Sequence, residues 1–463
     1  MQRQFITRMM RTLFGLCFVI LSASFIYGNI SVQERAALIA LYKATNGDGW
    51  QNNSGWKDPP LSGDGFSIPG TEDGWNGILI LDDSITEINL NSNNLFGSIP
   101  SEIETLGNLQ VLDLGWNMLS GEIPKSLGKL TQLQRLDLSW NQLSGRLPSE
   151  IGDLSSLEFL YLENNRFTGS LPPRLGNLLS LRIFSACGNR FSDNLPSSLG
   201  NLVNLEILEL SNNNLTGSLP GELGKLGRLR ILSLYLNQIS GTIPLEFGNL
   251  KNLESLDFWN NRLTGTIPSS FGNLRNLETL DLRDNRLSGA LPSALALLGN
   301  LKVLKLGNNA FTGAIPYQLG YLGNLKRLYL NNNRLTGVIP STLGNLGNLE
   351  WLCLQNNQLD GSIPVELGNL KNLLRLYLDH NNLNGTVPYL FGYLTNLRML
   401  HLNNNRFSGA VPFTLSKLTK IRSIKIGFNC LNKTEMNSIL KTWLDRHEPN
   451  WDADQNQCNE PRK

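Results

Sequence analysis

The chain has 463 residues, with 40 Lys and Arg against 38 Asp and Glu, which gives a formal net charge of +2. This length corresponds to about two or three ordinary globular domains or to one long repeat array. The near-neutral charge, without the Lys and Arg runs that follow a phosphate backbone, excludes nucleic acid as an expected partner.

Residues 1–28 have the layout of a secretory signal peptide. Arg3, Arg8 and Arg11 precede an apolar run over 13–26, which is followed by small residues and then by polar sequence. The run is shorter than the about 20 residues of a membrane span, which favours a cleaved signal over an uncleaved anchor. We therefore expect a secreted, extracellular protein of the cell wall or cell surface, with no membrane span in the mature chain.

Residues 29–84 are predicted to form an N-terminal cap that consists of a helix and a tryptophan-rich loop. The sequence SVQE is a capping box in which Ser31 and Glu34 satisfy backbone groups at the start of a helix. Helical spacing places Leu38 and Leu41 on one face. The tryptophans of the loop, which we interpret as core residues, are Trp50, Trp56 and Trp75.

Residues 85–431 repeat a single pattern, LxxLxLxxNxLxGxIPxxLGxL. Its asparagine recurs every 24 residues without insertion, and the last of the 15 units is partial. An unbroken period in the range of about 20–29 residues with this spelling indicates a leucine-rich-repeat solenoid. The repeated asparagines are Asn93, Asn117, Asn141, Asn165, Asn189, Asn213, Asn237, Asn261, Asn285, Asn309, Asn333, Asn357, Asn381, Asn405 and Asn429.

Each position of the pattern has a physical role. The two Leu of LxL alternate with exposed residues, as in a strand with one buried face, and successive strands stack in parallel. The inward Asn amide can satisfy buried backbone groups, Gly relieves the tight bend, and Pro presets the backbone before the next segment. The expected fold class is an α/β repeat solenoid, a right-handed superhelix with a concave parallel β-sheet and helical caps at both ends.

Residues 432–463 are predicted to form the C-terminal helical cap, with Asn432 and Glu435 at the start of its helix. Cys430 and Cys458 flank the cap and are predicted to form a disulfide, which would contribute about 3–4 kcal/mol. The apolar face of the helix is expected to comprise Met436, Ile439, Leu440, Trp443 and Leu444.

The spelling NxLSGxIPxxLGxL resembles the plant-type leucine-rich repeat of polygalacturonase-inhibiting proteins and of the ectodomains of receptor-like kinases and receptor-like proteins. The resemblance covers residues 85–431, about three quarters of the chain. It implies a curved, twisted solenoid that binds proteins or peptides on its concave sheet. The cap differs, because residues 74–90 lack the usual paired cysteines and residues 34–56 look more like caps of secreted microbial or algal proteins.

The residues that flank each inward Leu are expected to project from the concave face. In the column between the two Leu of LxL, acids predominate at first, and basic and aromatic residues take over from Lys305. We expect a water-facing strip with opposite charges at its ends, which favours a partner of matching polarity; the alternative is that these are ordinary solvated strand positions. The candidate ligand-binding residues are Asp113, Trp116, Asp137, Trp140, Tyr161, Glu209, Tyr235, Asp257, Trp259, Asp281, Lys305, Arg327, Tyr329, Trp351, Arg375, Tyr377 and His401.

Catalysis is not expected. Asp113 would lie about 5 Å from Asp137 on the next strand, near the spacing of a retaining glycosidase. An open sheet, however, should offer no pocket that raises a carboxyl pKa. No Ser–His–Asp pattern, Gly-rich phosphate loop or HExxH sequence occurs, and the three His are scattered. We therefore expect neither a cofactor nor a metal.

The sequence thus predicts a secreted, non-catalytic recognition protein that binds an extracellular protein or peptide on its concave face. The resemblance implies roles in perceiving an extracellular signal with a membrane partner, in defence, or in inhibiting a secreted cell-wall hydrolase. The alternative is a carbohydrate-binding or cell-surface adhesion module with a polysaccharide partner, since stacked aromatic residues also suit sugar rings.

Overall fold

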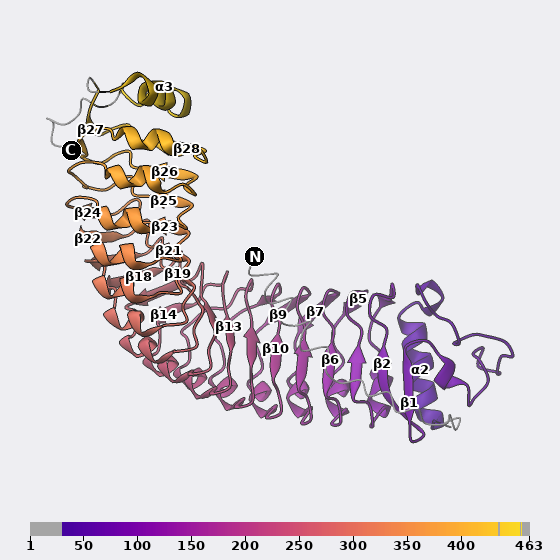
Figure 1. Ribbon diagram of the computed structural model, residues 1–463. Helices are drawn as coiled ribbons and strands as arrows, with labels where there is room; N and C mark the ends of the chain where they lie inside the picture. The colour runs from indigo at the N-terminus through magenta and orange to yellow at the C-terminus, as the bar shows by residue number, and fades with distance from the viewer. Residues whose placement is uncertain (1–29, 434–435, 454, 456–463) are drawn as a thin grey trace.

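The computed structural model describes residues 30–433, 436–453 and 455. They form one curved array of repeats, with α2 (Val32–Ala44) at one end and α3 (Ser438–His447) at the other (Figure 1). Over these residues, no helix has both the length and the apolar character needed to cross a bilayer.

One side of the array is a single sheet of 16 strands, which we call the concave sheet. Its first two strands pair antiparallel, and each later strand pairs in parallel with that of the next repeat. Because these strands lie only about 4.8 Å apart, the array curves toward them. In sheet order the strands are β1 (Ile78–Leu81), β2 (Ser84–Asn89), β4 (Val111–Asp113), β6 (Arg135–Asp137), β8 (Phe159–Tyr161), β10 (Ile183–Ser185), β12 (Ile207–Glu209), β13 (Ile231–Ser233), β15 (Ser255–Asp257), β17 (Thr279–Asp281), β19 (Val303–Lys305), β21 (Arg327–Tyr329), β23 (Trp351–Cys353), β25 (Arg375–Tyr377), β26 (Met399–His401) and β28 (Ser423–Lys425).

The register of the concave sheet aligns equivalent positions of neighbouring repeats. Leu112 pairs with Leu136, and Asp113 pairs with Asp137, one repeat further along the chain. The inward leucines are fully buried and form the core, as the alternation in LxL predicted. The register therefore confirms that residues at the same position of the repeat form columns across the sheet.

Short second strands run along the flank of the array in separate small sheets. The first contains β3 (Phe96–Gly97), β5 (Met118–Gly121), β7 (Gln142–Arg146), β9 (Arg166–Gly169) and β11 (Arg190–Phe191). The second contains β14 (Ser240–Thr242), β16 (Arg262–Gly265), β18 (Arg286–Ala290), β20 (Ala310–Gly313), β22 (Arg334–Val338) and β24 (Gln358–Asp360). The last is the pair β27 (Ser408–Ala410) and β29 (Cys430–Asn432).

The side opposite the concave sheet consists of short 3₁₀ helices, each of which follows the proline of the repeat pattern. Proline suits this place because its φ is already that of the helix start. These helices are η3 (Ser101–Thr105), η4 (Lys125–Lys129), η5 (Ser149–Asp153), η6 (Pro173–Asn177), η7 (Ser197–Asn201), η8 (Gly221–Lys225), η9 (Leu245–Asn249), η10 (Ser269–Asn273), η11 (Ser293–Leu297), η12 (Tyr317–Tyr321), η13 (Ser341–Asn345), η14 (Val365–Asn369), η15 (Tyr389–Tyr393) and η16 (Phe413–Lys417).

The repeated asparagines form a ladder of hydrogen bonds through the interior. In Asn117, the side-chain Nδ2 donates to the carbonyl oxygens of Leu90 and Leu114 at 2.9 and 3.0 Å. Its Oδ1 accepts from the backbone N–H groups of Asn93 and Leu95 at 3.0 and 2.9 Å. Each amide thus joins two repeats and satisfies backbone groups where the chain leaves the strand, which confirms the predicted role.

The N-terminal cap agrees with its predicted features. Ser31 and Glu34 form the reciprocal capping box at the start of α2, and the predicted core tryptophans are all buried. Arg35, also buried, forms ion pairs with Asp64 and Glu72. Two 3₁₀ turns, η1 (Gly47–Gly49) and η2 (Glu72–Gly74), complete the cap. The predicted signal peptide lies outside the described residues.

The C-terminal cap corrects the predicted helix. α3 begins at Ser438, where the side chain of Asn437 accepts from the N–H of Leu440 at 2.8 Å, and not at Asn432. Asn432 belongs to β29 because the last repeat continues through it. Leu440 and Leu444 are buried as predicted, whereas Ile439 is 69% exposed and does not belong to the buried face. Glu435 and Cys458, and with the latter the predicted disulfide, lie outside the described residues.

Candidate functional site: the concave sheet

The strands and the turns after them place every candidate ligand-binding residue on the concave sheet. The central column, defined as the residues between the two Leu of LxL, occupies the last position of each strand from Asp113 to His401. Trp116, Trp140, Tyr235 and Trp259 lie in the turns that directly follow a strand. Lateral pairing brings the equivalent residues of neighbouring repeats together, as predicted.

The expectation of a water-facing strip is wrong for the first half of the central column. The side chains there are buried, whereas from Lys305 onward several are half-buried. On an inward-curving sheet, side chains from adjacent strands converge and cover one another, and the acids also pair with basic neighbours. The buried candidates are Asp113, Asp137, Tyr161, Glu209, Asp257 and Asp281.

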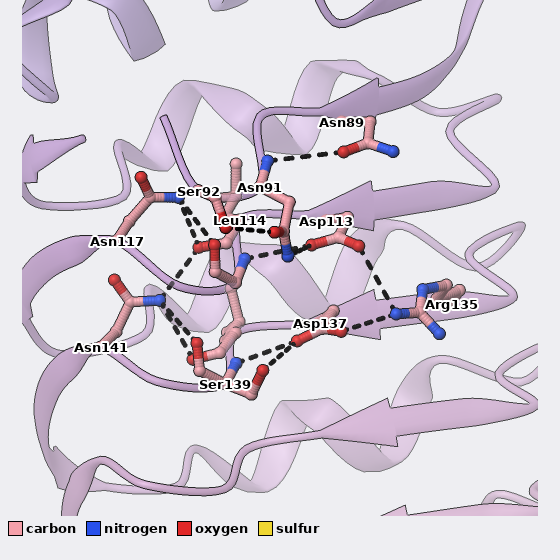
Figure 2. A network of polar contacts seen from close by, with 12 residues as sticks. Asn89, Asn91, Ser92, Asp113, Leu114, Asn117, Arg135, Asp137, Ser139 and Asn141 are labelled. Atoms are coloured by element: carbon pink, nitrogen blue, oxygen red, sulfur yellow. Dashed lines mark hydrogen bonds and ion pairs between the residues drawn. The ribbon is translucent and has the colours of Figure 1, made fainter. Parts of the chain in front are cut away.

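Asp113 and Asp137 share one guanidinium (Figure 2). Nη2 of Arg135 lies 2.6 Å from a carboxylate oxygen of Asp137 and 3.5 Å from one of Asp113. Asn91 donates to Asp113 at 2.9 Å, and the hydroxyl of Ser139 donates to Asp137 at 2.7 Å. Burial, and then the negative charge of Asp113, raise the pKa of Asp137. The two carboxylates are therefore bound by side chains of the chain's own neighbouring strands and turns.

A second charged cluster lies where the acidic part of the column meets the basic part. Asp281 is fully buried and accepts from Arg283 at 2.8 and 2.9 Å and from Nζ of Lys305 at 2.8 Å. Burial, followed by the charge of Asp281, raises the pKa of Asp257 to about 7. The first base of the basic half thus pairs with the last acid of the acidic half, so these two charges offset each other where the halves meet.

Glu163, which is not among the candidate residues, lies two positions beyond Tyr161. Burial, and then the charge of Asp137, raise its pKa to about 8, and its Oε2 is buried without a hydrogen-bond partner. Burial likewise raises the pKa of Glu209. The expectation that this sheet cannot raise a carboxyl pKa is therefore wrong. Glu163 lies two residues before the repeated Asn of its repeat, as the candidate Tyr235 does in its own. This shared position could have identified Glu163 from the sequence.

Arginines cover several concave aromatic rings. The guanidinium carbon of Arg375 lies 3.9 Å from the ring centroid of Trp351, and that of Arg327 lies 5.0 Å away. Arg283 lies 5.6 Å from the ring of Trp259 in the same way. Such cation–π contacts hold the rings in place and occupy one of their faces. Arg135 plays the same part for Tyr161, at 4.6 Å.

The half-buried end of the central column is rich in aromatic contacts. The Tyr329 ring lies 5.8 Å from the ring of Trp351, and the Tyr377 ring lies 4.8 Å from that of His401. Burial raises the pKa of Tyr329 to about 12 and lowers that of His401, which lies 2.9 Å from the Ser423 hydroxyl. This end therefore presents uncharged aromatic side chains beside arginines. In the middle of the sheet, the Tyr235 and Trp259 rings lie 5.9 Å apart.

Comparison with family models decides the family of this chain. The model described as "Leucine-rich repeat region" matches residues 88–185 and 301–446, more than half of the chain. Models described as "Leucine rich repeat" match most of the residues between, including 251–311. The chain belongs to the leucine-rich-repeat family. No curated protein sequence matches this leucine-rich-repeat protein.

Solved structures similar to this leucine-rich-repeat protein include plant receptors. The plant peptide hormone receptor RGFR1, in complex with RGF2, is 36% identical over 73% of this chain and 58% of its own, with a TM-score of 0.66. The TDR receptor is 35% identical over 74% of this chain and 68% of its own, with a TM-score of 0.63. A leucine-rich-repeat protein of Leptospira interrogans is 36% identical over 72% and 82%, with a TM-score of 0.58.

These similarities confirm the plant-type leucine-rich-repeat resemblance and the solenoid fold. The chain spans 58% of the length of the RGFR1 chain. The likeness of the N-terminal cap to microbial or algal caps stays a prediction.

Proposed function

We propose that this protein is an extracellular, non-catalytic recognition protein that binds a peptide or an extended protein segment along its concave sheet. The similarity to the RGFR1 ectodomain, whose structure contains the peptide RGF2, supports this proposal. Secretion rests on the signal peptide predicted at 1–28. The roles open to such a protein are extracellular signal perception, defence and inhibition of a secreted hydrolase.

The single observation that carries the proposal is the continuous register of 16 strands, which aligns side chains in columns along one elongated surface. An extended ligand can contact many repeats at once, and a rigid solenoid is already shaped for it, which lowers the entropic cost of binding. Aromatic and arginine side chains, which dominate binding hot spots, lie at its half-buried end, where Trp351 lies between Arg327 and Arg375.

A matched pair of variants tests this location of the ligand. Peptides selected from a displayed random library on the immobilised protein are titrated against Tyr329→Ser/Tyr377→Ser and against Tyr317→Ser/Tyr321→Ser. The first pair lies on the concave sheet, and the second pair is 55% and 62% exposed on η12, on the opposite side. We expect at least a tenfold loss of affinity only for the concave variant. Loss of affinity in the η12 variant alone, or the absence of any saturable binder, would contradict the proposal.

A further inference from the structure

The repeats contain four tryptophans, and they fall into two classes. An arginine of the chain lies over the ring of Trp259, and two lie over that of Trp351. Among the described residues, no cation lies over Trp116 or Trp140. These two residues, which we call the tryptophan pair, stack on each other with ring centroids 4.4 Å apart and planes inclined by 14°.

The tryptophan pair is exposed and conformationally strained. Trp116 is 55% exposed and Trp140 is 45% exposed. Their φ angles are 55° and 53°, in the left-handed region that bulky side chains rarely adopt. The corresponding residues of later repeats include Asn164 and Asn212, whose short amide tolerates this region. Two strained, exposed indoles contribute little to the core, which points to a role in binding.

The surroundings of the tryptophan pair are acidic. Gly115 precedes Trp116, and a Cβ added to it would lie 2.9 Å from Oδ1 of Asp137, so the glycine lets this carboxylate lie close to the backbone beside Trp116. The backbone N–H of Trp140 donates to the backbone carbonyl of Glu163 at 2.8 Å, which joins the turn of Trp140 to the next repeat. Two carboxyl groups, those of Asp113 and Asp137, thus share the single guanidinium of Arg135.

We propose that the tryptophan pair anchors an arginine side chain of the ligand, a proposal that rests on the proposed function. A guanidinium stacks flat on an indole face, is weakly hydrated, and directs its N–H groups at carboxylates in the same plane. This is the arrangement that Arg283 makes with Trp259 and Asp281 within the chain. The ligand supplies at Trp116 and Trp140 the cation that the chain itself supplies at the other two tryptophans.

Fluorine NMR of the full chain labelled with 5-fluorotryptophan tests the proposal. The probes are the peptides acetyl-Gly-Arg-Gly-amide and acetyl-Gly-citrulline-Gly-amide, which differ in charge but hardly in shape. We expect the arginine peptide to shift the signals of Trp116 and Trp140 at least fivefold more than the citrulline peptide does. The shift caused by the arginine peptide should be smaller at high salt, which screens charges. The signals of Trp259 and Trp351 serve as internal controls and should stay in place.

The variants Trp116→Asn and Trp140→Asn assign the two signals and separate binding from folding. Asparagine is the residue that other repeats place in this conformation, so we expect a Tm at least equal to that of the unmodified chain. Equal shifts with both peptides, no shift, or shifts caused only by a cello-oligosaccharide would overturn the proposal. If a library-selected peptide binds the Trp116→Asn/Trp140→Asn double variant with unchanged affinity, this inference is overturned and the proposed function is not. An arginine-specific shift in a protein with no concave peptide ligand overturns only the proposed function.

Discussion

The two ends of the concave sheet use the same residue types in different ways. Near the N-terminal cap, Trp116 and Trp140 stack on each other in the open, while Arg135 is engaged by two buried aspartates. Near the other end, Trp351 is half-buried and has an arginine on either neighbouring strand. The availability of an aromatic ring to a partner therefore depends on the charges that the adjacent repeats bring, and not on its position in the repeat alone.

The largest expected effect comes from removing the cation of the N-terminal end. Arg135→Met leaves Asp113 and Asp137 buried without their shared guanidinium, and losing one member of a buried charge cluster costs about 3–5 kcal/mol. We expect faster hydrogen exchange in β4, β6 and β8 and a lower urea midpoint. Adding Asp113→Asn and Asp137→Asn should recover most of the loss. Normal exchange rates in Arg135→Met would show that the cluster is not what stabilises this end.

A smaller effect is expected from pH. The pKa of Glu163 is about 8 in the folded chain and about 4.5 when unfolded, so the unfolded chain releases a proton that the folded chain keeps. The contribution of Glu163 to the free energy of unfolding is therefore greatest below about pH 4.5. This contribution falls by about 1–3 kcal/mol as the pH rises toward 8. In Glu163→Gln, the Tm should depend less on pH between 5 and 8. Glu222→Gln, on exposed η8, is the control, and an equal change in both variants would refute the assignment.

The smallest effect is expected at the C-terminal end. Arg375→Ala removes the closer of two guanidiniums over Trp351, but Arg327 remains, so the loss is about 0.5–1 kcal/mol. An uncharged quencher such as acrylamide should then quench the fluorescence of Trp351 more strongly. The double variant Arg375→Ala/Arg327→Ala should lose more stability than the two single variants together, because no guanidinium of these two residues then covers the ring. A loss as large as that of Arg135→Met would erase the contrast between the two ends.

The local features were predictable because they depend on spacing. The period of 24 residues placed every inward leucine and asparagine, and Ser31 with Glu34 marked the start of α2. The register also identified which side chains share the concave sheet, from Asp113 to His401. The start of α3 was missed because the last repeat extends through Asn432 and competes with the helix for that residue.

Sequence by itself determined the repeat, the core and the columns of this protein, since these follow from the alternation of apolar residues along a strand and from a constant repeat length. Only the tertiary structure decided the state of each column. Curvature brings side chains of neighbouring repeats together, so it buries Asp281 between Arg283 and Lys305, raises the pKa of Glu163 and leaves Trp116 stacked on Trp140 in the open. Most of these outcomes depend on contacts between neighbouring repeats, such as that of Lys305 with Asp281, 24 positions apart, which no single strand specifies.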